Sequence, residues 1–240
     1  MEDKYRASTE AAHLEQLEER RALDEEGVPC RLMAIGDSHF ERMRWNPEMK
    51  DYYELLKKQN VCILAKGGDR IEHLSWRLSH QTLDPTLFPF AGLKGIALLI
   101  GCNNLVDRPT KRMTIPAKIR QIISRLQARF TVPIYLFTLP YSPHSYDQGW
   151  NESIDIINQN IRDMDGDEGI KGIKGVKVID PWEATNADAA KAMAVPPADR
   201  PPLESGAGSM YFEDHCHFNH DGYRFLVDQI QALLNLENHS

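Results

Sequence analysis

Short apolar runs alternate with amphipathic stretches through most of this 240-residue chain, and this alternation limits the folds that the chain can adopt. Five runs are short and rich in branched apolar residues, as buried strands are; they cover 32–35, 61–65, 96–100, 132–139 and 176–179. Strands that alternate with helices pair in parallel, and a parallel sheet is covered by helices on both faces. The sequence therefore predicts a three-layer α/β/α sandwich with a five-stranded parallel sheet.

Amphipathic stretches fill the intervals between the predicted strands. The clearest has an apolar stripe at helical spacing, formed by Ile115, Ile119, Ile122, Ile123, Leu126 and Phe130. Further stripes run over 154–164 and 226–234. A helix with one apolar stripe packs against a sheet. With right-handed connections, five strands most commonly take the flavodoxin-like order 2-1-3-4-5, which places sites at the carboxyl ends of the strands.

The chain length fits one domain over 29–240, preceded by a helical extension over 1–28 in which Ser8 or Thr9 can act as the helix cap. One stretch breaks the alternation. Residues 184–213 are rich in proline and glycine, with only a short Ala-rich piece that could be helical. We expect a Pro-rich loop insertion there, and two interpretations stay open, a flap over a site and a solvent-exposed excursion.

The formal net charge of −7 argues against nucleic acid or an anionic membrane as the main partner. The N-terminal segment lacks the apolar core of a secretion signal, and the longest apolar stretch, 95–101, is too short to span a bilayer. The four cysteines have no metal or redox spacing, so we expect thiols in a reducing compartment. These features predict a soluble cytoplasmic protein. The helical extension could pack on a second subunit, so a homo-oligomer stays open.

Polar residues follow the first three predicted strands. Ser38 comes between the first strand and the helix after it, where its side chain can reach a crevice and its N–H lies near a helix N-terminus. A nucleophile needs both properties, although a simple helix cap is the commoner meaning of such a serine. Gly68 follows the second strand and could leave an N–H free to donate. Asn103 follows the third strand, and its carboxamide can donate to a substrate oxygen.

A further polar cluster, residues 214–220, directly precedes the last helical stripe. Asp214 and His217 are three positions apart, so both can face the same way in a turn. A carboxylate in that position can accept the Nδ1 proton of the imidazole and leave Nε2 to act as a base. Each of these polar features is weak alone. Together they fall at successive positions along one edge of the predicted sheet.

In this order and spacing, the four blocks resemble those of the SGNH (GDSL-like) hydrolases; they read GDSH, KGGD, GCNN and DHCH. The resemblance implies that Ser38 is the nucleophile, that His217 is the general base and that Asp214 orients it. It implies an oxyanion hole made by the backbone N–H groups of Ser38 and Gly68 and the side chain of Asn103. The implied reaction is hydrolysis of a small-molecule ester through an acyl-serine, with no metal or cofactor.

The stretch GGDRIEHLSWRL is similar to the corresponding part of the intracellular platelet-activating-factor acetylhydrolase catalytic subunits, which suggests a small acyl group. Three residues depart from the usual family pattern. His39 replaces a leucine after the serine, Asn104 replaces an aspartate after the asparagine, and Ile63 stands where many members have asparagine. These departures concern the shape and specificity of the pocket. Asp37 is expected to be structural.

The segment after the fourth strand, 140–144, is expected to form a wall of the pocket. Aromatic residues near the blocks could line it as well or could be ordinary packing residues; they are Phe40, Trp45, Tyr141 and Tyr146.

Other functions remain open. Residues 215–220 superficially resemble the HxHxDH zinc motif of metallo-β-lactamase-like enzymes, but only 20 residues follow His220 and the further ligands are missing. A catalytically silent binding module could keep the same fold. The same triad could also serve a thioesterase, a lysophospholipase or an acyltransferase.

Overall fold

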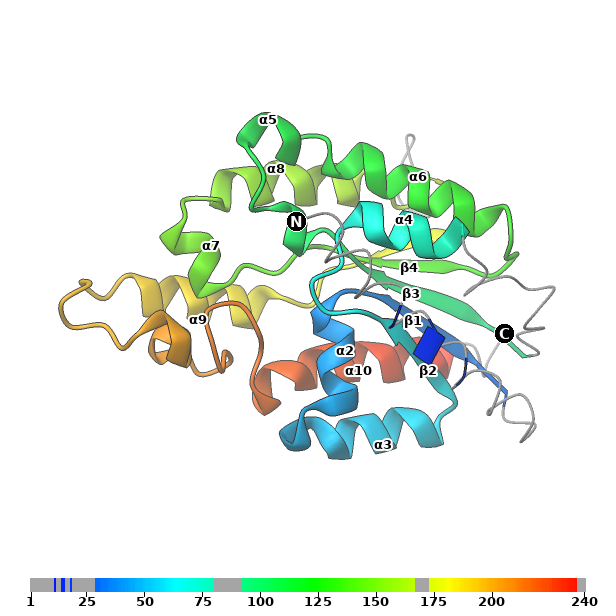
Figure 1. The fold of residues 1–240 in the computed structure, drawn as a ribbon, viewed down its shortest axis with the longest axis horizontal. Helices are drawn as coiled ribbons and strands as arrows, with labels where there is room; N and C mark the ends of the chain where they lie inside the picture. The colour runs from blue at the N-terminus through cyan, green and yellow to red at the C-terminus, as the bar shows by residue number, and fades with distance from the viewer. Residues whose placement is uncertain are drawn as a thin grey trace.

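The computed structural model describes residues 29–79, 92–166 and 173–236, together with Ala11, Leu14, Glu15 and Glu18. One five-stranded parallel sheet, in the order β2-β1-β3-β4-β5, runs through the molecule (Figure 1). Its strands are β1 (Leu32–Gly36), β2 (Val61–Ala65), β3 (Gly95–Leu99), β4 (Ile134–Phe137) and β5 (Val176–Ile179). The predicted strand order is confirmed, and so is the α/β class.

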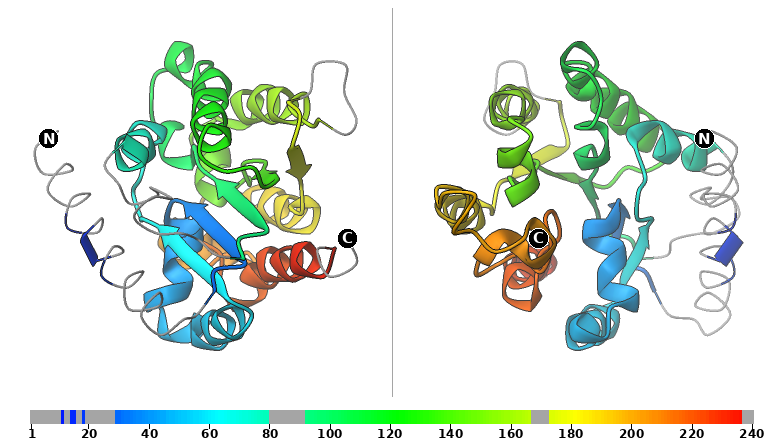
Figure 2. Two further views of the ribbon diagram at one scale, coloured as in Figure 1. Left: turned by 90° about the vertical axis from the view of Figure 1, so that its right-hand side faces the viewer. Right: turned by 60° about the vertical axis from the view of Figure 1, so that its left-hand side comes forward.

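Helices cover both faces of the sheet (Figures 1 and 2). One face carries α2 (Ser38–Trp45), α3 (Lys50–Lys58) and α10 (His220–Leu236). The other carries α4 (Ile71–Ser79), α6 (Ile115–Gln127) and α8 (Asn151–Arg162). The remaining short helices lie in the connections; they are η1 (Pro47–Met49), η2 (Cys102–Asn104), α5 (Pro109–Arg112), α7 (Pro143–Asp147), α9 (Glu183–Met193) and η3 (Leu203–Gly208). The three-layer sandwich is the arrangement expected for a parallel sheet.

The core lies on both sides of the central strands. Every residue of β1, β2 and β3 is buried, as near-continuous apolar strands require when helices pack on both faces. The stripe predicted between 115 and 130 is buried throughout; its residues from Ile115 to Leu126 belong to α6, and Phe130 lies just after the end of that helix. β5 is less covered: Val176 and Ile179 at its ends are buried, whereas Lys177 and Val178 between them are more exposed.

The register of the central strands aligns their carboxyl ends. Gly36, the last residue of β1, pairs with Ala65 of β2 on one side and with Leu99 of β3 on the other. The segments that follow these three strands therefore leave the sheet at the same edge, which is where the sequence analysis placed the polar blocks.

The first part of the segment 184–213 is helical, because α9 covers Glu183–Met193; this helix is longer than the short Ala-rich piece expected there. Alanine has the highest helix propensity, and Thr185, Ala189 and Ala192 are buried on one side of this helix. The irregular part that follows contains η3, where Gly206 and Gly208 have positive φ angles. α9 packs against α7 and η3, at one end of the molecule (Figure 1).

The helix predicted over 1–28 lies outside the described residues except for four positions, all of them helical. Among these, the Glu15 carboxylate lies 3.6 Å from the guanidinium of Arg44 on α2. Within the described part of the chain, no helix combines the length and the apolar character that a membrane crossing needs.

We expect Gly36→Ala to lower the free energy of unfolding by about 2–4 kcal/mol, because the new Cβ would lie 1.9 Å from the carbonyl oxygen of Leu99. The Leu99 oxygen belongs to the backbone of β3, and the new Cβ would be attached to the backbone of β1. Since these two strands are paired, neither atom can move away. Urea unfolding of the purified variant measures the loss. Gly149→Ala is the control: Gly149 has φ +63° but nothing within 4 Å of the added Cβ, so only about 1 kcal/mol of backbone strain is expected.

Candidate active site

Ser38, His217 and Asp214 form a chain of hydrogen bonds at the carboxyl edge of the sheet. Nε2 of His217 lies 3.0 Å from Oγ of Ser38, and Nδ1 of His217 lies 2.8 Å from Oδ2 of Asp214. The serine and the histidine are 179 positions apart in the sequence. The structure thus brings together the three residues that the sequence predicts as a nucleophile and its base system.

Asp37 determines where Ser38 lies. It caps α2, and its Oδ1 atom accepts a hydrogen bond from the backbone N–H of His39 at 3.1 Å. The cap starts the helix at Ser38, the residue directly after the strand β1 and its Asp37 turn. The N–H of a first helical residue has no intrahelical acceptor, so the Ser38 N–H is available to another acceptor. Asp37 is fully buried and structural, as expected.

The Asp214 carboxylate is held by the turn that it begins. Its Oδ1 atom accepts hydrogen bonds from the backbone N–H groups of Cys216 at 2.8 Å and of His217 at 2.7 Å. Burial alone would raise the pKa of Asp214, but these bonds and the one from the His217 ring outweigh it and hold that pKa well below its usual range. Asp214 is therefore an anion that fixes the orientation of the imidazole.

Burial lowers the pKa of His217 below its usual value, and the hydrogen bond to Asp214 only partly offsets this effect. The imidazole is consequently neutral near pH 7. With Nδ1 directed at the carboxylate, the neutral tautomer that carries its proton on Nδ1 has a free lone pair on Nε2, directed at the Ser38 hydroxyl.

The loop after β2 is fixed by α2. Glu41, on the helix turn after Ser38, accepts a hydrogen bond from the Gly67 N–H at 2.7 Å and contacts Lys66 Nζ at 3.2 Å. Gly68 follows with φ +78°, a conformation that glycine adopts without strain. Since the Gly67 N–H is occupied, the N–H of Gly68 is the one that this loop leaves for another acceptor.

Asn103 lies on η2 and faces the loop after β2. Its Nδ2 atom donates a hydrogen bond to the carbonyl oxygen of Asp69 at 2.9 Å. A carboxamide nitrogen carries two protons, so one N–H is used for positioning and the other remains. The neighbouring Asn104, which departs from the family pattern, is buried and structural: its Oδ1 accepts from the Ile71 N–H at 3.0 Å, and its Nδ2 donates to Glu72 at 3.0 Å.

A buried ion pair supports these loops from below. The guanidinium of Arg77 contacts the Asp69 carboxylate at 2.8 and 2.9 Å, and both side chains are almost fully buried. Arg77 also donates to the carbonyl oxygens of Leu64 at 2.9 Å and Gly36 at 3.4 Å. Burial raises the pKa of Asp69 to about 6, although Arg77 opposes this rise. Arg77 thus ties the ends of β1 and β2 to the residue that orients Asn103.

A cavity of about 520 Å³ lies above the Ser38–His217 pair. The three residues expected to bind an oxyanion, Ser38, Gly68 and Asn103, all line it. The predicted wall is present as well, because Pro140, Ser142 and His144 line the same cavity.

Of the four aromatic residues that could line the pocket or serve as ordinary packing residues, one lines the cavity and three do not. Trp45 lines the cavity. Phe40 is fully buried in the core, Tyr146 lines a different cavity, and Tyr141 hydrogen-bonds Asp155.

Several residues around the cavity were not predicted. His144 packs edge-on against both Trp150 and His215, with ring centroids 5.0 and 5.1 Å apart. Arg42 lies between the carboxylates of Glu213 and Asp214. Spacing along one helix could have found Arg42, since it lies one turn after Ser38, but no sequence signal indicates its partners.

The three histidines of the zinc-like motif do not converge. His217 contacts Ser38, His215 packs against His144, and His220 contacts Asp51 at 2.9 Å and stacks on Tyr52. In the described part of the chain, two groups have three possible ligand atoms within 4.8 Å of one another; they are Asp37, His39 and Cys102, and Asp214, Cys216 and His217. Neither group contains His215 or His220.

All four cysteines belong to the described residues and are thiols rather than disulfides. Cys102 and Cys216 line the cavity. Burial raises the pKa of both thiols, and the Asp214 carboxylate adds to the rise at Cys216. A neutral thiol is a poor nucleophile, so neither cysteine has the thiolate character that a reactive cysteine needs.

A serine, histidine and aspartate at the carboxyl edge of a parallel sheet are typical of hydrolases. The model of the GDSL-like lipase/acylhydrolase family matches residues 34–225, and the chain belongs to this family. No curated protein matches the sequence.

Solved structures share the fold. A Streptococcus pneumonia protein, provisionally described as a platelet activating factor, is 17% identical, with a TM-score of 0.64 over 97% of this chain and 95% of that one. A member of the lipolytic protein G-D-S-L family from Veillonella parvula is 14% identical, with a TM-score of 0.56 over 84% and 96%. A carbohydrate esterase family 3 protein from Talaromyces cellulolyticus is 12% identical, with a TM-score of 0.53 over 88% and 99%.

We expect Arg77→Met to destabilise the protein by about 3–5 kcal/mol, because it leaves the Asp69 carboxylate buried without its counter-charge. The double variant Asp69→Asn/Arg77→Met should recover a large part of this loss, since no buried charge then remains. Thermal and urea unfolding measure both. A double variant as unstable as the single one would contradict this account of the pair.

Proposed function

We propose that this protein is a serine ester hydrolase that cleaves a small-molecule carboxylic ester through an acyl-serine intermediate. The observation that carries the proposal is the hydrogen-bonded chain from Asp214 through His217 to Ser38, at 2.8 and 3.0 Å, at the floor of a cavity. Membership of the GDSL-like lipase/acylhydrolase family supports the same reaction class.

In the first half of the reaction, Ser38 Oγ attacks the ester carbonyl while Nε2 of His217 takes its proton. The carbonyl oxygen gains negative charge, which the N–H groups of Ser38 and Gly68 and the remaining Nδ2–H of Asn103 would hold. Asp214 stabilises the imidazolium that forms. His217 then returns the proton to the leaving alkoxide oxygen, so the alcohol departs and an acyl-serine remains.

In the second half, His217 takes a proton from a water molecule, and the resulting hydroxide attacks the acyl-serine carbonyl. The same donors hold the second oxyanion. When it collapses, the proton returns to Ser38 and the carboxylic acid is released. Every proton is moved by Nε2 of one histidine, which is why the orientation set by Asp214 matters.

The local likeness to the platelet-activating-factor acetylhydrolase subunits favours a small acyl group. The same groups could also cleave a thioester or a lysophospholipid, or transfer the acyl group to another acceptor. Hydrolysis is the proposal, and the chain-length profile of the test below separates short acyl groups from long ones.

We expect hydrolysis of p-nitrophenyl esters, from acetate to octanoate, with turnover abolished in Ser38→Ala and unchanged by EDTA. The serine is the proposed nucleophile, and no step of the proposed reaction uses a metal. Loss of turnover with EDTA alone would revive the metal interpretation. Absence of turnover on every ester, together with no labelling of Ser38 by a fluorophosphonate, would contradict the proposal and favour a silent binding module.

Asn103→Ala should lower kcat by about 10²–10³-fold with a much smaller change in KM, because its N–H acts on the oxyanion of the transition state. Steady-state kinetics on p-nitrophenyl acetate measure both constants. Asn104→Ala is a contrasting variant: Asn104 contacts Ile71 and Glu72 rather than the cavity, so its effect should appear mainly in stability. A change in KM with an unchanged kcat in Asn103→Ala would argue against an oxyanion role.

The activity should persist below pH 6.5. His217 must be neutral to act as a base, and burial lowers its pKa from the ordinary value of 6.5. Activity is therefore full above the pKa and falls as the pH decreases through it, so the midpoint of the acid limb of kcat/KM lies below 6.5. A pH profile with p-nitrophenyl acetate measures this midpoint. A midpoint above 6.5 would contradict a neutral, desolvated base.

A further inference from the structure

We propose that the ion pair of Arg42 and Glu213 is a positioning device for the proposed base system: Arg42 anchors the Asp214 carboxylate, and Glu213 balances the charge of Arg42 at His217. The inference rests on the proposed function, because it concerns the same serine and histidine. It assigns a role to two residues that the reaction described above does not use.

Arg42 lies one helical turn after Ser38, so both side chains leave the same face of α2. Its Nη2 atom contacts Oε1 of Glu213, and its Nη1 atom lies 3.8 Å from Oδ2 of Asp214. The Asp214 oxygen that faces Arg42 is the same one that faces Nδ1 of His217. One guanidinium therefore links the helix of the nucleophile to the loop of the base.

The pair is held from both sides. The guanidinium of Arg42 lies over the ring of Trp45, 5.0 Å from its centroid, which fixes the plane of the fork. On the other side, Asn46 Nδ2 donates to Oε2 of Glu213 at 3.4 Å. Trp45 is the last residue of α2 and Asn46 is its C-cap, so this one short helix and its cap carry the proposed nucleophile, the cation and the supports of the ion pair.

Partial burial makes these charges effective. The side chains of Arg42, Glu213 and Asp214 are 16%, 18% and 24% exposed. Charges in such places are screened less than charges on the open surface. With the Glu213 carboxylate, the cluster of Arg42, Glu213 and Asp214 has a net charge of one negative. Without that carboxylate, the positive charge of Arg42 would be left to neutralise Asp214.

The groups that face His217 come from two segments. Its own loop supplies Asp214, which favours protonation of the ring, and the neutral thiol of Cys216. α2 supplies His39, 6.1 Å away between ring centroids, and Arg42, and both oppose protonation.

Glu213 offsets the electrostatic effect of Arg42 on His217, because the carboxylate and the guanidinium are in contact. The proton affinity of His217 therefore depends on the balance between one cation and its counter-ion.

The test is the rate at which a fluorophosphonate labels Ser38, measured against pH in the full-length protein. This rate reports the protonation of His217 without any assumption about the natural substrate. In Arg42→Gln we expect the midpoint of the acid limb to move up by about 0.3–1 pH unit, because a cation near the ring is lost. In Glu213→Gln we expect it to move down by a similar amount, because an anion is lost.

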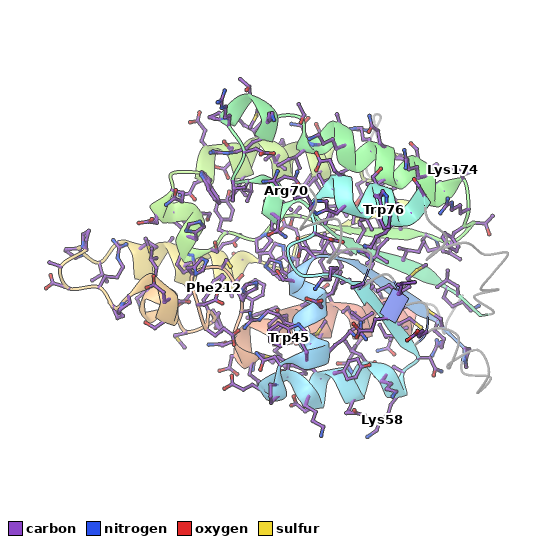
Figure 3. All side chains as sticks on the ribbon, in the orientation of Figure 1. Trp45, Lys58, Arg70, Trp76, Lys174 and Phe212 are labelled. Atoms are coloured by element: carbon purple, nitrogen blue, oxygen red, sulfur yellow. The ribbon has the colours of Figure 1, made fainter. Side chains whose placement is uncertain are left out.

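Two controls isolate the charge effect. Arg42→Lys keeps the cation, so its midpoint should stay near that of the wild type, even where the lost fork geometry slows labelling. The ion pair of Arg70 and Asp107, with nitrogen and oxygen 3.2 Å apart, is a matched pair that does not line the cavity. In Figure 3, Arg70 lies near α4, whereas Trp45 lies at α2. Arg70→Gln and Asp107→Asn should leave the midpoint unchanged.

Opposite shifts in the two variants support the proposal, because a merely structural role would slow labelling without moving the midpoint in opposite directions. Shifts in the same direction, or no shift in either, overturn it. If circular dichroism shows that Arg42→Gln does not fold, the downward shift in Glu213→Gln decides alone. A wild type that is never labelled refutes the proposed function itself, which is a separate result.

Discussion

The parallel register of β1 with β2 and β3 is the constraint on which the site depends. Gly36 pairs with the last residues of both neighbours, so three loops leave the sheet at one edge. The closeness of β1 and β3 at this point leaves no room for a Cβ on Gly36. The Asp37 cap then begins α2 at once, and Ser38 needs no long loop to reach the cavity. Backbone pairing, rather than side-chain chemistry, therefore determines where the reactive groups can lie.

Polar contacts convert that shared edge into one network. The Asp69 carbonyl oxygen accepts a hydrogen bond from Asn103, and the Asp69 carboxylate pairs with Arg77, so the loops after β2 and β3 and the helix α4 are joined at one residue. Glu41 binds the same β2 loop from α2. Each contact uses a group that would be costly to bury without a partner. The consequence is that Asn103 and the loop after β2 are held in place by contacts within the protein, which the proposed oxyanion hole would need.

Much of the fold could be predicted, because the signals are local. The apolar stripe of α6 and the buried runs of the strands need only periodicity, and the blocks around Ser38 and His217 follow from their places between elements. The helix α9 was underestimated, because its stability depends on packing against α7 as well as on its alanines. The Arg42–Glu213 contact could not be predicted, since it joins residues that only the tertiary fold brings together.

The wall of the cavity and the base loop share a direct link. The backbone N–H of His144, on α7, donates to the carbonyl oxygen of His215 at 2.8 Å, two residues before His217. A substrate group too large for the cavity would press on α7 and strain the loop that carries the imidazole. Misalignment of a reacting group slows chemistry more than it weakens binding. Selection by substrate size would then act on turnover rather than on binding: oversized esters would bind in the cavity but would react slowly.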